Sequence, residues 1–248
     1  YNLNNYYTGL FPFGDGSSNN LSYTVALSRN NTFTNPIFPL GGSEFVLSAR
    51  FSLPYSLWNG IDYANLGDLE KFQDDEGNPD PAKIEQEKFK WLEFYKIKFK
   101  GSWYTRLFDK LVLRTHTEFG FLGAFNNDRG VIPFDRFFLG GDGMSQYAMD
   151  GRETISLRGY PNQSLSSQDG STIYNRFSLE LRYPITLKPA ASIFGLTFME
   201  TGQGYNNFRE FNPFNGKRSV GLGLRIFMPA FGLLGIDFGY GLDSVNEF

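Results

Sequence analysis

Apolar and polar residues alternate along most of this chain with a period of two. Such alternation is typical of β-strands, because successive side chains of a strand point to opposite faces. Seven segments carry the pattern and an eighth is apolar on both faces; their ranges are 21–28, 45–53, 95–103, 113–121, 177–183, 193–202, 219–226 and 234–242. No segment shows convincing helical periodicity. The pattern therefore predicts an all-β protein with about eight antiparallel strands.

The two faces of these strands differ in a way that indicates the class of protein. The apolar face is dominated by leucine and by aromatic residues, of which the chain has 27 Phe and 14 Tyr. The opposite face carries small and charged residues; the charged positions are Arg50, Lys96, Lys98, Lys100, Arg114, Glu118, Glu180, Arg182, Arg225 and Asp237. An outward aromatic face and a polar interior are typical of transmembrane β-barrels.

The connections between the strands alternate between short and long. The short ones lie at 107–110, 186–191 and 230–232, and the long ones at 58–90, 126–172 and 203–217. Short turns at one end and long loops at the other are a second mark of outer-membrane barrels. A sheet that spans a membrane has to close, because every backbone polar group there needs a partner. A soluble β-sandwich with long loops is the alternative, since its strands alternate too.

The composition offers little catalytic chemistry. The chain has no cysteine, which excludes thiolate nucleophiles and cysteine-ligated zinc, and its net charge of −3 provides no basic surface for nucleic acid. His116 is the only histidine. We expect it to be a solvated residue of the wall, because no second histidine could complete a metal site. The acidic stretch 74–80 lacks the glycine and glutamate of a calcium loop. We therefore expect no enzyme activity, no metal and no cofactor.

Both ends of the chain bear on its completeness. No window reaches the roughly 18 apolar residues of a transmembrane helix, and the first ten residues lack the pattern of a signal peptide. The charged interior favours a barrel wider than one closed by eight strands. Phe248 is the terminal aromatic residue expected of an outer-membrane barrel, but residues 243–247 read as a loop. We therefore expect a closing strand to be missing and the chain to be a fragment of a larger barrel.

Several motifs resemble those of a known family. The segments PFDRFFLGGDGM (133–144), LRGY (157–160), NRFSLELRYPI (175–185) and FGLTFMETGQGY (194–205) follow one another along the chain. Upstream, NPIFPLGGSEFVLSARFSLP (35–54) contains Phe38, Pro39, Gly42 and Ser43 in the order Phe-Pro-x-x-Gly-Ser. In this order the motifs resemble the C-terminal barrel of the outer-membrane-protein assembly family, the BamA family. Its sixth extracellular loop carries an Arg-Gly-Phe/Tyr motif.

The resemblance covers nearly the whole chain and implies one partial β-barrel domain over residues 1–248. If the motif loop at 126–173 joins strands eleven and twelve, the chain runs from about strand eight to strand fifteen of a barrel of about sixteen strands. Strand parity then places the long loops outside the cell and the short turns in the periplasm. The acidic loop 58–90 and an insertion at 146–155 resemble the Bacteroidetes type of this Gram-negative family.

The resemblance also implies a site. In the family the sixth loop folds into the lumen, where its arginine meets carboxylates of the wall. Carried over, the loop motif is Arg158, Gly159 and Tyr160, and the carboxylates are Glu180 and Glu200. One guanidinium can bind two carboxylates, because it offers five donors in a fixed fork. Glu180 has the parity of the polar face. Glu200 shares the parity of residues 194, 196 and 198, which simple alternation directs toward lipid. It faces the lumen only if these residues point inward or a bulge shifts the register.

The function implied is the folding and insertion of β-barrel proteins into the bacterial outer membrane. The implied partners are unfolded outer-membrane proteins, the lipid bilayer, and periplasmic and lipoprotein accessory subunits, with no nucleic acid. A TamA-like translocation factor and a secretion-partner transporter share the motifs and are alternatives. A passive outer-membrane pore would explain the charged interior but not the motif loop. An outer-membrane hydrolase would need a nucleophile and a base that the sequence does not indicate.

Overall fold

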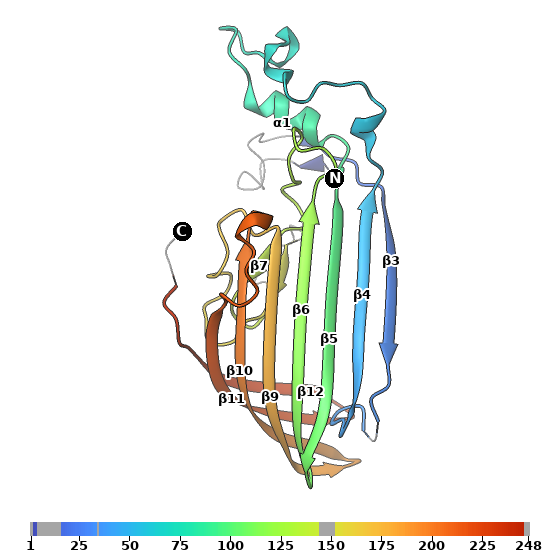
Figure 1. Cartoon of the computed structure of the whole chain (residues 1–248), viewed down its shortest axis with the longest axis vertical. Coiled ribbons are helices and arrows are strands. Elements are labelled where there is room, and N and C mark those ends of the chain that lie inside the picture. The colour runs from blue at the N-terminus through green and yellow to red at the C-terminus, as the bar shows by residue number, and fades with distance from the viewer. Residues whose placement is uncertain (1, 4–15, 34, 144–151, 246–248) are drawn as a thin grey trace.

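The computed structural model describes residues 2–3, 16–33, 35–143 and 152–245. One eight-stranded antiparallel sheet dominates, in the order β12–β11–β10–β9–β6–β5–β4–β3 (Figure 1). The strands are β3 (Ser22–Asn30), β4 (Gly42–Ser52), β5 (Tyr95–Phe108), β6 (Leu111–Gly123), β9 (Ile173–Lys188), β10 (Ala191–Tyr205), β11 (Lys217–Met228) and β12 (Gly232–Gly241). All eight predicted strands are confirmed. A small pair, β1 (Asn2–Leu3) with β2 (Gly16–Ser17), precedes them.

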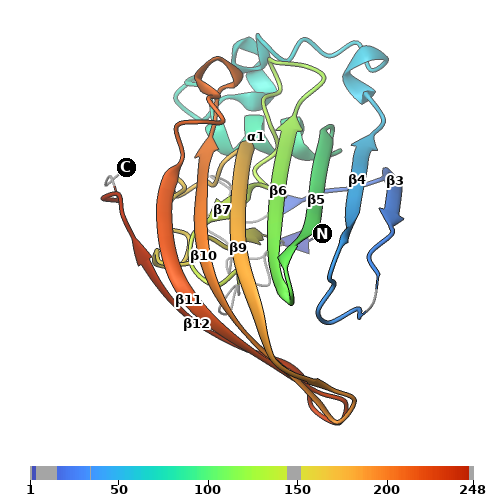
Figure 2. The same cartoon turned by 60° about the horizontal axis from the view of Figure 1, so that its bottom comes forward.

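The sheet is strongly curved, so that it has an inner, concave face and an outer, convex face (Figures 1 and 2). Large apolar side chains lie exposed in rows on the outer face, among them Val25, Leu222, Ile236 and Phe238 at 59–80% exposure. No second sheet packs on these rows within the described residues, as a β-sandwich would require. Rows of this kind fit a lipid environment, since soluble proteins rarely expose such large contiguous apolar surfaces.

The two ends of the sheet differ as the sequence predicts, except that the connection 31–41 is as long as 206–216. At one end the strands are joined by the connections 31–41, 109–110, 189–190 and 229–231; at the other they are joined by 53–94, 124–172 and 206–216. Two of the sequence predictions concern residues that the structure does not describe. Residues 146–151 of the predicted insertion 146–155, and the terminal Phe248, lie outside the described residues.

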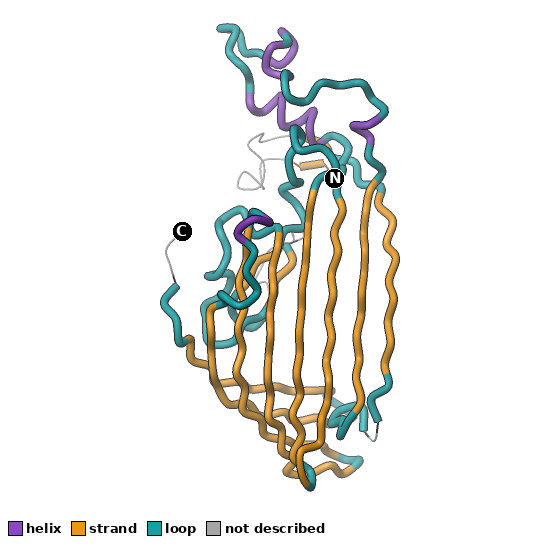
Figure 3. Tube along the Cα trace, viewed as in Figure 1, coloured by secondary structure: helices purple, strands orange, loops and turns teal. Residues whose placement is uncertain are grey.

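The expectation that the chain contains no helix is wrong. The connection 53–94 holds α1 (Pro81–Phe89) and the short helices η1 (Tyr55–Leu57), η2 (Leu66–Asp68) and η3 (Glu70–Phe72), drawn in purple in Figure 3. Asp80 caps α1, accepting hydrogen bonds from the backbone N–H groups of Ala82 and Lys83, and Pro81 occupies the first position. Both are helix-start signals. Nine residues are too few for a clear helical period, so the start signals were the only usable ones. None of the described helices has the length and apolar character needed to cross a membrane.

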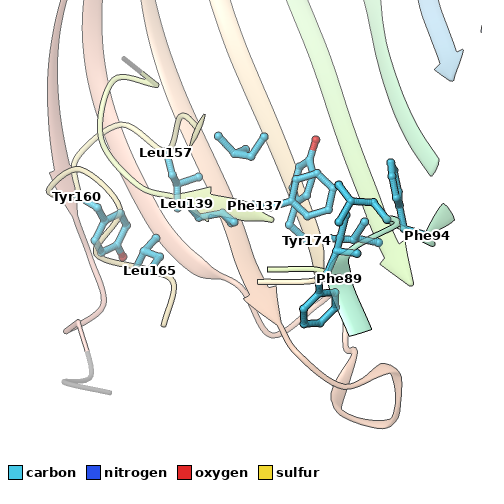
Figure 4. Close-up of a cluster of buried hydrophobic side chains, with 12 residues drawn as sticks. Phe89, Phe94, Phe137, Leu139, Leu157, Tyr160, Leu165 and Tyr174 are labelled. Atoms are coloured by element: carbon cyan, nitrogen blue, oxygen red, sulfur yellow. The ribbon is translucent and has the colours of Figure 1, made fainter. Parts of the chain in front are cut away.

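The longest connection, 124–172, folds onto the inner face of the sheet. Its segments β7 (Phe137–Leu139) and β8 (Glu153–Ile155) pair in parallel. Phe137, Leu139 and Leu157 are fully buried in a cluster that includes Tyr174 of β9 (Figure 4). The rings of Phe137 and Tyr174 lie 4.6 Å apart. The loop is therefore packed against the wall as part of a hydrophobic core.

Candidate functional site

Arg158 of the inner loop lies between the two carboxylates that the sequence singled out. Its Nη2 is 2.7 Å from Oε1 of Glu180 and 2.6 Å from Oε1 of Glu200, and its backbone N–H donates to Oε2 of Glu200 at 3.0 Å. The Glu200 side chain has no exposed surface and that of Arg158 has 11%. The guanidinium also lies 3.7 Å from the ring centroid of Phe198. The structure thus brings Arg158, Glu180 and Glu200 together.

The orientation of β10 corrects the simple alternation. Phe194, Leu196 and Phe198 are buried on the inner face with Glu200, while Met199 is 55% exposed on the outer face. Phe194 pairs with Pro184 and Ile193 with Thr186, which leaves Ile185 as an extra residue. This is a β-bulge in β9. Simple alternation, which directs residues 194, 196 and 198 toward lipid, is therefore wrong here. These side chains point inward, one of the two ways left open for Glu200 to face the lumen, and they pack in one buried cluster with Phe38 and Tyr104.

A wider set of charged side chains surrounds this triad. Arg176 joins Glu200 to Glu118, at 2.7 Å and 3.1 Å. Glu180 also contacts Arg114 and Arg182, and Arg158 lies 3.5 Å from Asp237, which binds Arg225 at 2.7 Å. Arg176 was not predicted from the sequence, although its parity with Glu180 could have indicated it. Buried charges need such partners, because removing one from water costs several kcal/mol.

The charge on Arg158 is well supported. Burial disfavours the charged form, but the hydrogen bonds and negative charges of Glu200 and Glu180 outweigh it and raise the pKa of Arg158 above its ordinary value. The guanidinium of this contact therefore stays charged at neutral pH.

Gly159 and Tyr160 attach the loop to the next pair of strands. Gly159 has φ +91°, and a Cβ there would lie 2.8–3.0 Å from backbone atoms of Tyr240 and Gly241 in β12. Only glycine fits this conformation and this approach. The hydroxyl of Tyr160 donates to the carbonyl of Arg218 at 2.6 Å. The Arg-Gly-Tyr motif therefore spans from β9 and β10 to β11 and β12.

A second group of ion pairs holds the opposite side of the loop. Glu153 of β8 contacts Lys96 at 2.8 Å and Lys98 at 2.9 Å, and Asp135 contacts Arg50 at 3.1 Å. Burial raises the pKa of Glu153, but the two lysines outweigh it and the net effect is a pKa below the ordinary value. The wall cations were expected on this face; their partners in the loop were not identifiable, because they depend on the path of the loop.

The expectation that His116 is solvated is wrong. It is 8% exposed, with Nδ1 2.9 Å from Oγ of Ser102 and Nε2 2.7 Å from Oε1 of Glu118. This order of groups resembles a catalytic triad. However, Ser102 is 2% exposed and its hydroxyl also accepts a hydrogen bond from Arg114 at 3.1 Å. The three groups act as a hydrogen-bonded part of the wall. Within the described residues, no cluster of His, Asp and Glu has an arrangement suited to a metal ion.

The turn motif lies at the short-turn end. Phe38 is 1% exposed and its ring packs edge-on against Phe194 at 5.1 Å, on the inner face of β10. Gly42 has φ +95°, and a Cβ there would lie 2.4 Å from the carbonyl oxygen of Asn31. Ser43 donates its N–H to the side chain of Asn31 at 2.7 Å. Pro39 lies beside Phe38 in the same turn. The motif closes the turn and sends one aromatic ring across the base of the inner face.

A cavity of about 880 Å³ lies between the wall and the part of the loop around Arg158. Its charged lining consists of Arg114, Asp142, Arg158, Arg176, Glu180, Arg225 and Asp237. Both signs are present and most are paired. The charged side chains of this site therefore bind one another, and in doing so they attach the loop to the wall.

Known proteins share this fold. The family model of the Omp85 superfamily domain matches residues 3–247. The chain is similar in structure to the crystal structure of BamA from Haemophilus ducreyi lacking POTRA domains 1–3, with a TM-score of 0.57, 18% sequence identity, and coverage of 90% of this chain and 39% of that one. No curated protein matches the sequence. The resemblance to a BamA-type barrel and the fold class of an antiparallel transmembrane barrel are confirmed.

Proposed function

The chain belongs to the Omp85 superfamily, and from this premise we propose that it forms part of the barrel of an outer-membrane-protein assembly factor. The barrel would receive unfolded β-barrel proteins from the periplasm and help them to insert into the outer membrane. The observation that carries this proposal is the inner loop, whose Arg158 is bound to Glu180 and Glu200 of the wall. A barrel that only conducts solutes has no need of such a buried attachment.

The proposed mechanism needs no nucleotide. A substrate strand would pair with a free strand edge by β-augmentation, so that backbone hydrogen bonds supply the affinity. The described sheet is then the wall beside that edge. The attachment of the inner loop to β9, β10, β11 and β12 would keep the curvature of this wall constant while the substrate enters. Periplasmic and lipoprotein subunits would deliver the substrate, and the long acidic loop 53–94 supports a Bacteroidetes-type member.

Two alternative functions differ from assembly in what passes through the barrel, which is one dedicated protein in the first and small solutes in the second. A TamA-like translocation factor or a secretion-partner transporter would use the same loop to pass one dedicated substrate. A passive pore is favoured only by the charged cavity, and the loop that occupies the inner face argues against it.

The test is to deplete the full-length protein in its host and to quantify the outer-membrane proteome. A broad fall in unrelated β-barrels, with periplasmic stress, is the expected result. Loss of a single secreted or surface protein would point to a dedicated transporter. An unchanged set of barrels would contradict the assembly function.

A further inference from the structure

The connection 206–216, between β10 and β11, takes an unusual path. It folds down over the outer face of the sheet, and its helix η4 (Phe208–Glu210) lies beside the upper ends of β9 and β10 (Figure 3). Asn175 pairs in the sheet with Phe119 and therefore points to the outer face. It is nevertheless fully buried, because the loop covers it, and its side chain donates to the carbonyl of Pro213 at 3.1 Å.

Aromatic rings join this loop to the apolar outer face. Phe121 of β6 lies 6.0 Å from Phe208 and 5.7 Å from Phe211, centroid to centroid. Tyr205 lies 5.5 Å from Phe211. These contacts extend the apolar rows of the wall without a break into the loop. The loop is also well ordered by its own hydrogen bonds, since Asn207 caps η4 and the side chain of Asn212 accepts from the N–H of Phe214.

The far side of the loop presents aromatic rings away from the protein. Phe208 is 69% exposed and Phe214 is 92% exposed. An ordered loop gains nothing by holding two phenylalanines in water, whereas an aromatic ring at the boundary of headgroups and acyl chains is favourable. The connection 124–172 packs on the inner face of the sheet, whereas 206–216 lies against the outer face, which is the surface that would face lipid.

We propose that the segment 206–216 is embedded in the outer leaflet of the bilayer, at the boundary between headgroups and acyl chains, with Phe208 and Phe214 in contact with lipid. The occupant of this aromatic surface is lipid because the surface is continuous with the lipid-facing rows of β6, β9 and β10. The segment would anchor the wall at a fixed depth beside the attachment point of the inner loop. This inference rests on the proposed membrane location.

The test uses spin labels, which is convenient because these 248 residues contain no cysteine. Phe214→Cys, Leu222→Cys and Glu76→Cys are made separately in the full-length protein, freed of any cysteine elsewhere. Each is labelled with a nitroxide in vesicles of phosphatidylethanolamine and phosphatidylglycerol. Leu222 is the lipid-facing control on β11, and Glu76 is the control in the exposed loop 53–94. Collision rates with oxygen, which partitions into lipid, are compared with those of a water-soluble nickel chelate.

We expect the label at 214 to have an oxygen-to-nickel ratio several times that at 76 and below that at 222, as for a shallow position in lipid. A ratio at 214 equal to that at 76, with 222 still in lipid, would overturn the inference and leave the membrane location intact; the loop would then be free for a protein partner. If 222 is also in water, the proposed membrane function itself fails.

Discussion

At the scale of single residues, the chain concentrates buried charge around Arg158. Glu200 has no exposed surface and accepts hydrogen bonds from both Arg158 and Arg176. Each charge is tolerated there only because the others are present, since an unpaired buried charge is strongly destabilising. Because Arg158 is bound to both Glu180 and Glu200, we expect the replacement of any of the three to act on stability.

Replacing Arg158 by alanine should therefore weaken the folded barrel. We expect Arg158→Ala to lower the free energy of unfolding by about 3–5 kcal/mol, because it removes one cationic partner from each of two buried carboxylates. Arg158→Lys should lose less of the free energy of unfolding than Arg158→Ala. The lysine ammonium keeps the positive charge but lacks the planar set of donors with which a guanidinium binds two carboxylates. Urea titration followed by the gel mobility of the folded barrel measures the effect. Arg106→Ala, at an exposed position of β5, is the control. Equal midpoints for Arg158→Ala and the parent would remove the proposed anchoring role.

Gly159 offers a test that leaves all charges in place. Gly159→Ala should lower the unfolding midpoint and the yield of folded protein, because a Cβ would meet the backbone of β12 at a positive φ. Gly195→Ala in β10 is the matched control, since a Cβ added there would have no neighbouring atom within 4 Å. If both variants unfold at the same denaturant concentration, the close approach of the loop to β12 contributes nothing to stability.

At the scale of elements, the inner loop behaves as a second layer fastened at both sides. The Arg-Gly-Tyr motif binds β9 to β12, while β8 binds β5 through Glu153, Lys96 and Lys98. The aromatic cluster around Phe137 fills the space between these two attachments. The two attachments differ in the group that the loop supplies, which is the guanidinium of Arg158 in one and the carboxylate of Glu153 in the other.

The attachment through Glu153 should weaken in acid. Its pKa is lower in the folded protein than the ordinary 4.5, so the ion pairs contribute fully above pH 4.5 and are lost as the pH falls through the folded value. We expect Glu153→Gln to be less stable than the parent at pH 7, and the difference to shrink as the pH falls below 4.5 and through the lowered pKa of Glu153. Urea midpoints from pH 7 to pH 3 measure this. A difference that stays constant over that range would contradict the role of the charge.

At the scale of the whole molecule, an open curved sheet carries its core on one side and its apolar surface on the other. Among the described residues, β3 and β12 are the edges of the sheet and do not pair with each other. The inner loop occupies the concave side, so this wall does not line an empty channel (Figure 4). Movement of the loop would change what the barrel can conduct.

This arrangement predicts a conductance that depends on Arg158. In planar bilayers the full-length protein should show a small conductance, and Arg158→Ala should show larger or more frequent openings, because the loop loses its main attachment to β9 and β10. Arg106→Ala, at an exposed position of β5, should leave the conductance unchanged. A large, open conductance that is identical in the parent and in Arg158→Ala would favour a passive pore.

Local patterns determined the strands, their two faces and the contrast between short and long connections, because a period of two and a turn length are set by neighbouring residues. The sequence also placed Arg158, Glu180 and Glu200 on one site through a resemblance, and their role stays a prediction. It did not reveal α1, since nine residues carry too short a period. The inward turn of Phe194 and Glu200, the bridge made by Arg176, the burial of His116 and the path of 206–216 were decided by tertiary structure. Each of these features depends on a bulge, on strand register or on the course of a loop. These are set by contacts between residues far apart in the chain, which local patterns do not reveal.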